Sequence, residues 1–161
     1  MVVLNAAAAL WEYLPYGARA EGSGPVGLYV EQDGPIKQRP QLRPGASLRG
    51  LQHQISINSA GFRGTELLDP KPSNGLRIWC SGGSTTFDIY APDDASTWPA
   101  QLGAALQQAL PERHVEVINA GIPGEILWGS TQDFQAHHEA IRPDILVVYA
   151  GPTISARCAT T

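Results

Sequence analysis

The segment CSGGSTTF, residues 80–87, contains the side chains of this sequence best suited to covalent chemistry. It places two glycines and several hydroxyl groups directly after an apolar run at residues 76–79. A serine on a sharp turn after a buried strand can act as a nucleophile when a base removes its proton. The same residues also suit a phosphate-binding turn, because backbone N–H groups at a helix start attract anions.

The residues around this segment predict three strands that alternate with two helices. The expected strands cover residues 76–81, 114–120 and 145–150, and Pro111 and Pro143 end the helices between them. The residues expected on the apolar helix faces are Trp98, Leu102, Ala105, Leu106, Ala109 and Leu110, then Leu127, Thr131, Phe134, His138 and Ile141. Strand–helix–strand order predicts a parallel sheet covered on both faces, and hence an α/β fold with three α/β/α layers.

The rest of the chain lacks this regular alternation of strand and helix patterns. Residues 1–50 predict an irregular N-terminal arm with one short strand at 26–30, and residues 51–151 form the α/β domain. Residues 152–161 predict an unstructured tail, and the sequence shows no internal repeat.

Composition and charge argue against some classes of function. The chain has 161 residues, and eleven Lys and Arg against fifteen Asp and Glu give a net charge of −4. This balance offers no basic surface for nucleic acid and no polybasic membrane patch. The N-terminal segment lacks the pattern of a signal peptide or membrane span, which predicts a cytoplasmic protein by default. An extracytoplasmic location is expected instead if the segment is the clipped remnant of an anchor.

Three loops should meet at one edge of the expected sheet. They are GGSTTFD at 82–88, GIPGEI at 121–126 and GPTIS at 151–155, and each follows the carboxyl end of a strand. Ligands of doubly wound sheets bind beyond these ends. Each loop begins with glycine, which lets the backbone turn sharply beside a ligand.

Four segments in order resemble the SGNH or GDSL hydrolases, a family of esterases, lipases and carbohydrate O-acyl processing enzymes. They are INSAGFRG (57–64), RIWCSGGSTTF (77–87), VEVINAGIPG (115–124) and RPDILVVYAG (142–151). The resemblance covers roughly residues 50–151 and implies a flavodoxin-like parallel sheet of the SGNH hydrolase type. It also implies an acyl-ester substrate, small or carbohydrate, and no metal or organic cofactor.

The resemblance assigns roles to three residues. Ser84 would be the nucleophile and would donate its N–H to the oxyanion, in a Gly-Gly-Ser variant of the family's Gly-Asp-Ser. Gly124 would supply a second oxyanion-hole N–H. Thr153 stands where the family has an asparagine, and its hydroxyl is a weaker donor. The family's Asp-x-x-His block does not occur before Thr161, so the domain is expected to be truncated after its third core strand.

None of the four histidines is predicted to replace the missing base. His114 opens the second strand, and His137 and His138 lie late in the second helix, so all three should lie far below Ser84. A six-residue strand spans roughly 20 Å, whereas a general base must lie within about 3 Å of the hydroxyl or reach it through one water. His138 is expected to pack at the core edge. Only His53 lies in a segment whose distance from Ser84 is not set by the direction of the strands and helices.

We therefore predict a serine ester hydrolase whose activity is weak or absent. One alternative is a flavodoxin-like module that binds phosphate or nucleotide through Ser81, Ser84, Thr85 and Thr86. Asp88, Asp93 and Asp94 follow closely, and the loop has no Lys or Arg, which weighs against it. The other alternative is a non-catalytic interaction domain that self-associates through an exposed third strand.

Overall fold

The computed structural model describes residues 25–30, 41–49 and 53–149 of the chain. Its elements are η1 (Pro25–Leu28), β1 (Ser47–Arg49), β2 (Gln54–Ser56), β3 (Gly75–Gly82), α2 (Ser84–Phe87), α3 (Trp98–Ala109), β4 (His114–Gly121), α4 (Leu127–Ile141) and β5 (Ile145–Tyr149). Thr153, the expected tail and most of the expected N-terminal arm lie outside the described residues.

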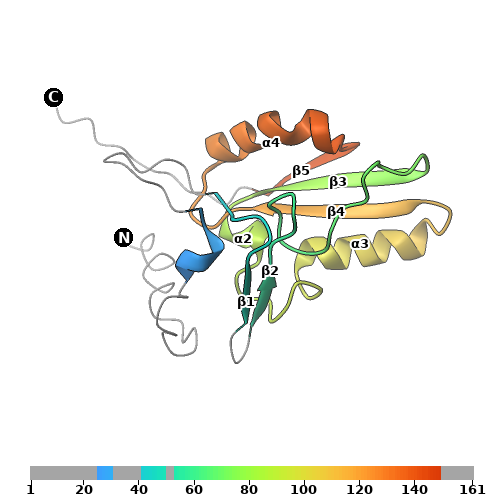
Figure 1. Ribbon diagram of the computed structural model, residues 1–161. Coiled ribbons are helices and arrows are strands. Elements are labelled where there is room, and N and C mark those ends of the chain that lie inside the picture. Colours follow the sequence, from blue (N-terminus) through green and yellow to red (C-terminus); the bar gives the residue numbers. More distant parts are fainter. Residues whose placement is uncertain (1–24, 31–40, 50–52, 150–161) are drawn as a thin grey trace, which may run out of the picture.

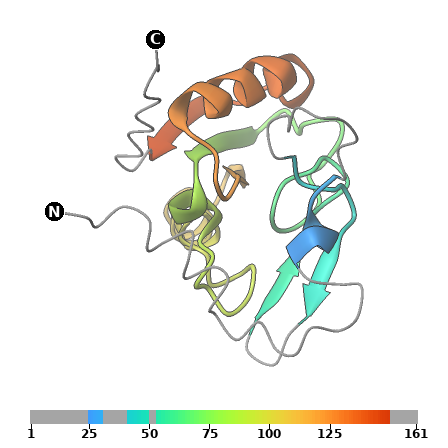
Figure 2. The same cartoon turned by 90° about the vertical axis from the view of Figure 1, so that its left-hand side faces the viewer.

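A three-stranded parallel sheet in the order β4–β3–β5 forms the centre of the domain. Gly75 pairs with His114 and Gly82 with Gly121, so β3 and β4 start and end level. Helix α4 lies on one side of this sheet and α3 on the other (Figure 1; Figure 2 gives the end view). The three strands and two helices predicted for residues 76–150 are present, and the prediction of an α/β fold with a parallel sheet is confirmed.

Helix α3 begins and ends where its sequence signals lie. The Thr97 side chain accepts a hydrogen bond from the Ala100 N–H, and Pro99 occupies the first turn, where its missing N–H is not needed. The predicted inner face is partly wrong, because Ala105 and Ala109 are exposed. Gly103 faces the sheet instead: a Cβ on this glycine would approach Val117 Cγ2 at 3.2 Å. The small residue therefore lets the helix lie close to β4.

Helix α4 is rotated relative to the prediction. Leu127, Thr131 and His138 are exposed, whereas Gly129, Ser130 and Asp133 are buried. Small and polar side chains thus form much of its inner face. The predicted face is partly wrong: Phe134 and Ile141 pack inward as expected, but the tightest contacts on this helix are made by residues that carry little hydrophobic signal.

The described part of the N-terminal arm packs into the domain. The arm cluster consists of the buried residues Leu28, Leu42, Ile55, Ile57, Phe87, Ile89 and Ile122. The predicted strand at 26–30 is wrong: Pro25–Leu28 form a 3-10 helix, and a single bridge joins Tyr29 to Leu42. β1 pairs antiparallel with β2, so the expected domain boundary at residue 50 falls inside a hairpin.

An aromatic cluster lies between the sheet and α4. Its buried members are Phe62, Trp79, Ile118 and Ala120, and Phe134 and Ile141 pack against them. Trp79 is fully buried, with Phe62 4.9 Å and Phe134 5.5 Å from it between ring centroids, both edge-on. Edge-to-face contacts of this kind add to the free energy gained by burial.

Strand β5 forms an edge of the described sheet, with only β3 beside it. Four of its five side chains are exposed, namely Ile145, Leu146, Val148 and Tyr149 at 44–55%. The expectation that this apolar run is covered on both faces is therefore wrong for the described residues. Among the helices described here, none combines the length and apolar character needed to span a membrane.

Candidate functional site at the carboxyl edge of the sheet

Ser84 lies directly beyond the carboxyl end of the central strand. β3 ends at Gly82, Gly83 precedes the helix, and Ser84 is the first residue of α2, half-buried at the surface. A side chain at position 82 would overlap Thr86 Oγ1 and the carbonyl oxygen of Tyr149. The first glycine of the Gly-Gly-Ser turn is therefore required by close packing.

The loop that carries Gly124 lies beside this turn. The Ile122 N–H donates to the Gly82 carbonyl at 3.1 Å. A Cβ on Gly83 would stand 3.0 Å from the carbonyl oxygen of Glu125. The second glycine of the turn thus lets the β3–α2 and β4–α4 loops approach each other, and it brings the loops of Ser84 and Gly124 together.

Gly124 has a left-handed backbone conformation, with φ of +86°, and is exposed. Glycine adopts this conformation without the steric cost that a Cβ would bring. A tight turn results, in which the Glu125 N–H donates to the Ile122 carbonyl at 3.0 Å. The first N–H groups of α2, including that of Ser84, have no acceptor within the helix because of their position.

The carboxyl end of β5 reaches the same turn. The Thr86 hydroxyl donates to the Tyr149 carbonyl at 3.2 Å and lies 3.3 Å from the Ser81 carbonyl. Thr153 follows four residues later, outside the described residues. Two of the three predicted loops are therefore observed together, and the third, residues 151–155, lies outside the described residues.

The Arg63 side chain is hydrogen-bonded to the C-terminal end of α2 and to Asp94. Its Nε donates to Asp94 Oδ1 at 2.8 Å, and its Nη1 donates to the carbonyls of Phe87 and Asp88 at 3.0 and 2.9 Å. These charge-assisted hydrogen bonds satisfy carbonyl groups at the end of the single-turn helix α2. Phe62 packs edge-on against Trp79 of β3, and Arg63 forms a backbone bridge with Asn119 of β4, so these two residues hold the preceding segment against the sheet.

Two other residues support the site. Asn119 ties the loop, since its Oδ1 accepts from the Gly121 N–H and its Nδ2 donates to the Phe87 carbonyl. Glu125 is not a solvated loop charge. Its carboxylate is 8% exposed, accepts from the Ile126 N–H at 3.0 Å and lies over Gly129, at the start of α4. A carboxylate there stabilises the positive end of the helix.

The histidines are arranged largely as predicted from chain direction. His114 pairs with Gly75, seven residues along the strand from the Gly82–Gly121 pair that adjoins Ser84. His53 Nδ1 lies 3.3 Å from the Ala91 carbonyl. Within the described ranges, no histidine forms a hydrogen bond with Ser84.

The prediction that His138 packs at the core edge is wrong, and its neighbour takes that place. His138 is exposed and stacks on Phe134, whereas His137 is half-buried and lies 5.7 Å from Phe62 between ring centroids. His137 also pairs with Asp133, with 3.5 Å between Nδ1 and Oδ1. The Asp-x-x-x-His spacing at 133–137 was the available sequence signal, since residues four apart share a helix face.

Cys80 has no reactive character. It is fully buried on β3, and burial raises the pKa of its thiol to about 12. The thiolate is the nucleophilic form, so this cysteine is inert at neutral pH. No cluster of His, Cys, Asp and Glu suited to a metal ion is found in the part of the chain that the structure describes.

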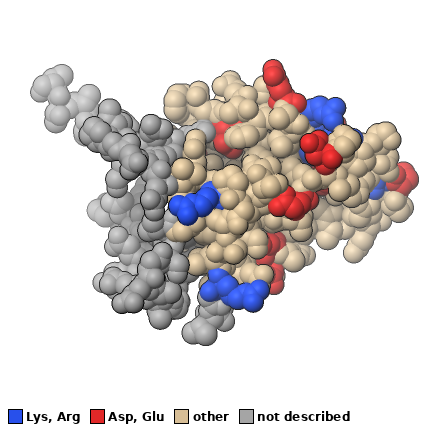
Figure 3. All heavy atoms as spheres, viewed as in Figure 1, with Lys and Arg blue, Asp and Glu red and all other residues tan. Residues whose placement is uncertain are grey.

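Two cavities in the described part of the chain lie away from Ser84. One of about 190 Å³ lies between α4 and the N-terminal arm, and one of about 630 Å³ lies between α3, β4 and residues 64–68. Neither Ser84 nor Gly124 is among the described residues that line them. On the face shown in Figure 3, acidic and basic side chains of the described residues are interspersed, without a broad patch of one sign.

Comparison with known proteins adds no assignment. No protein-family model matches the chain, and no curated protein matches it significantly.

Proposed function

We propose that the chain carries the nucleophile half of a serine ester hydrolase of the SGNH or GDSL type, acting by acyl-ester hydrolysis or O-acyl transfer through Ser84. One observation supports this above the others: the Gly83 and Glu125 backbones pack so closely that the loops of Ser84 and Gly124 meet at one sheet edge. The proposal includes the flavodoxin-like, three-layer α/β/α arrangement of that family.

In this mechanism Ser84 Oγ attacks the ester carbonyl, and the carbonyl oxygen acquires negative charge. The N–H groups of Ser84 and Gly124 stabilise that oxygen if they lie about 2.7–3.1 Å from it in the transition state. The Thr153 hydroxyl is the proposed third donor. Expulsion of the alcohol leaves an acyl group on Ser84, which water or a second hydroxyl then removes.

The proposed rate is low, because no described histidine is hydrogen-bonded to Ser84. In a serine protease, removal of the histidine base lowers kcat by about 10⁶. Backbone donors alone retain a residual rate over water of roughly 10³–10⁴. We therefore propose weak or absent turnover for this chain as it stands.

Hydrolysis of p-nitrophenyl butyrate tests this function. Any turnover should be slow and should disappear in Ser84→Ala, while Ser96→Ala, which changes an exposed serine, should leave it intact. Turnover that persists in Ser84→Ala would contradict the role of the serine. Ser84-dependent turnover at ordinary enzyme rates, about 1 s⁻¹ or more, would contradict the proposal of weak or absent turnover.

A second candidate function, that of an interaction module, is favoured by the exposed apolar side chains of β5. An unpaired strand edge with apolar faces is a site for pairing with another chain. We propose a second copy of the chain as the partner, a proposal that does not depend on Ser84.

A further inference from the structure

The inner face of α4 carries an ionisable pair that the ester-hydrolase proposal does not use. Asp133 is 8% exposed, and His137, one turn later, packs against Phe62 and Trp79. Burying a carboxylate is costly unless charged or hydrogen-bonding groups compensate it. A helix that only covers a sheet has no need of such a pair on its inner face.

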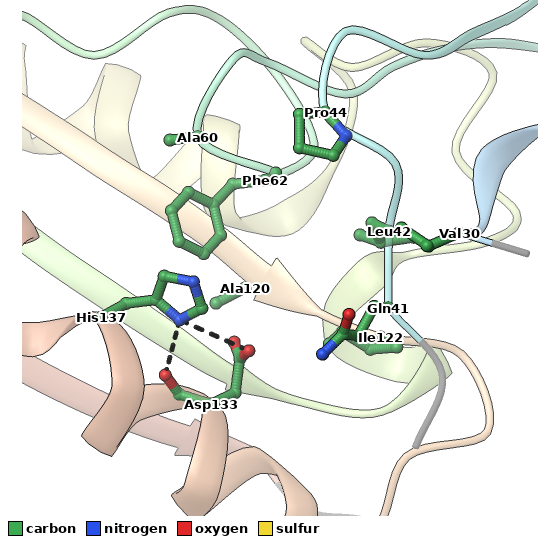
Figure 4. Close-up of a pocket in the computed structure, with 11 residues that line it drawn as sticks. Val30, Gln41, Leu42, Pro44, Ala60, Phe62, Ala120, Ile122, Asp133 and His137 are labelled. Atoms are coloured by element: carbon green, nitrogen blue, oxygen red, sulfur yellow. Dashed lines mark hydrogen bonds and ion pairs between the residues drawn. The ribbon is translucent and has the colours of Figure 1, made fainter. Parts of the chain in front are cut away.

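This pair borders the cavity of about 190 Å³ (Figure 4). The volume is roughly ten times what one buried water requires. Its walls come from α4, the end of β4, the 60–62 turn and the described residues around the arm. The lining is mostly apolar, with Val30, Leu42, Pro44, Phe62, Ala120 and Ile122, and its polar side chains are Gln41, Asp133 and His137.

Hydrogen bonding fixes which nitrogen of His137 carries the proton. Nδ1 lies 2.8 Å from the backbone carbonyl of Asp133, and a carbonyl can only accept, so Nδ1 is the donor. In the neutral imidazole, Nε2 is then an acceptor. Figure 4 shows this second nitrogen directed away from Asp133, into the space beside Phe62 and Pro44.

The ring is also held in orientation. Its centroid lies 5.7 Å from that of Phe62 and 6.2 Å from that of Trp79, and Trp79 is fully buried. Asp133 Oδ1 lies 3.5 Å from Nδ1, and its electrostatic attraction also helps to hold the ring. An acceptor held in a fixed direction at an apolar wall provides specificity for a ligand with a matching donor.

We propose that this cavity binds a small neutral organic molecule with an apolar body and one hydroxyl group, of about the size of phenol. The hydroxyl donates to His137 Nε2, and the body packs against Leu42, Phe62 and Ile122. The Asp133 carboxylate beside the ring disfavours anionic ligands. The proposal is independent of Ser84.

Titration of the full chain with phenol and with anisole, followed by ¹H–¹⁵N NMR, tests the site. Anisole has the same ring but no hydroxyl donor. Phenol should bind saturably and shift resonances of residues 120–122 and 133–137, with an affinity about tenfold above that of anisole. Equal affinities, or the absence of saturable phenol binding, would overturn the proposal.

Two histidine-to-phenylalanine variants test whether His137 Nε2 accepts the hydrogen bond from the ligand. His137→Phe keeps a ring beside Phe62 and Trp79 but removes Nε2, and it should abolish the preference for phenol. His138→Phe changes the exposed neighbour on the same helix turn and should leave the preference unchanged. An equal loss in both variants would overturn the assignment to His137. If His137→Phe does not fold, the phenol-to-anisole ratio of the unaltered chain still decides.

Discussion

A Cβ on Gly83 would stand 3.0 Å from the carbonyl oxygen of Glu125. This approach joins the turn that begins α2 to the loop that precedes α4, and therefore joins Ser84 to Gly124. Replacement by valine should push the loops apart, because the carbonyl belongs to the backbone and cannot rotate away as a side chain can.

We expect Gly83→Val to lower the free energy of unfolding by about 1–3 kcal/mol, as overpacking does. The rate at which a fluorophosphonate modifies Ser84 should fall at least tenfold. Gly27→Ala is the control, because a Cβ there meets no atom within 4 Å. Unchanged modification of Ser84 in the Gly83 variant would show that the two loops act independently.

Arg63 should contribute strongly to the stability of the fold. Its side chain is fully buried and pairs with Asp94 and the carbonyls that end α2. Arg63→Met leaves Asp94 without its cation, and breaking a buried pair in this way costs about 3–5 kcal/mol. Urea denaturation measures the loss. Arg49→Met, an exposed arginine on β1, should change the free energy by less than about 0.5 kcal/mol. Similar effects of both variants would contradict this role.

Asp144 should make the stability depend on pH. Burial of this carboxyl opposes ionisation, but donation from the Arg77 N–H at 2.7 Å and from Lys71 Nζ at 2.6 Å outweighs it and lowers the pKa. A lowered folded-state pKa stabilises the fold above the unfolded-state value of about 3.9. The contribution is lost as the pH falls through the folded-state pKa.

Asp144→Asn should therefore destabilise the protein at pH 7, by at most about 1 kcal/mol because the side chain is 40% exposed. The difference from the unaltered chain should shrink toward pH 2, in urea denaturation at both pH values. Glu139→Gln, an exposed carboxylate on α4, corrects for net charge. A difference that stays constant with pH would mean that the hydrogen bonds of Asp144 do not depend on its charge.

The sequence was most informative for the elements around the sheet. Continuous apolar runs and the helix-ending Pro111 predicted β3, β4, β5 and α3 closely, because those signals lie within or directly beside each segment. The inner face of α4 was predicted only in part: Phe134 and Ile141 pack inward as expected, whereas the buried Gly129, Ser130 and Asp133 follow no hydrophobic period. The packing of Leu28 and Leu42 depends on contacts distant in sequence, so the arm could not be placed by local pattern.

The sequence predicted only part of the candidate site. Local patterns indicate where loops follow strands, but they do not reveal contacts between residues distant in sequence. Loops that follow parallel strands meet at one edge regardless of their detail, which placed Ser84 beside the Gly124 loop. The burial of Glu125 depends on Gly129, one helical turn away, and no local signal reveals it. The Asp133–His137 pair required knowledge of how α4 is rotated. Helix α2 is a single turn, so the phosphate-binding alternative has little helix dipole to draw on.

The exposed edge of β5 should make the chain associate. Ile145, Leu146, Val148 and Tyr149 are 44–55% exposed along one strand. Sedimentation velocity should show an average mass that rises with protein concentration. Val148→Lys should reduce this rise, because a charge at a strand edge opposes pairing. Leu68→Lys, at an exposed leucine outside β5, should not. A monomer at all concentrations would exclude the interaction candidate.

The central claim is that Ser84 lies in an oxyanion-stabilising turn, and site-resolved modification tests it most directly. The folded chain is incubated with a fluorophosphonate, and peptide mass spectrometry compares the rate at Ser84 with that at the exposed Ser96. Two oriented N–H donors should make Ser84 react at least about 10²-fold faster, since one donor is worth roughly 10²–10³ in rate. Denaturation should remove the difference. Equal rates at the two serines in the folded chain would contradict the account.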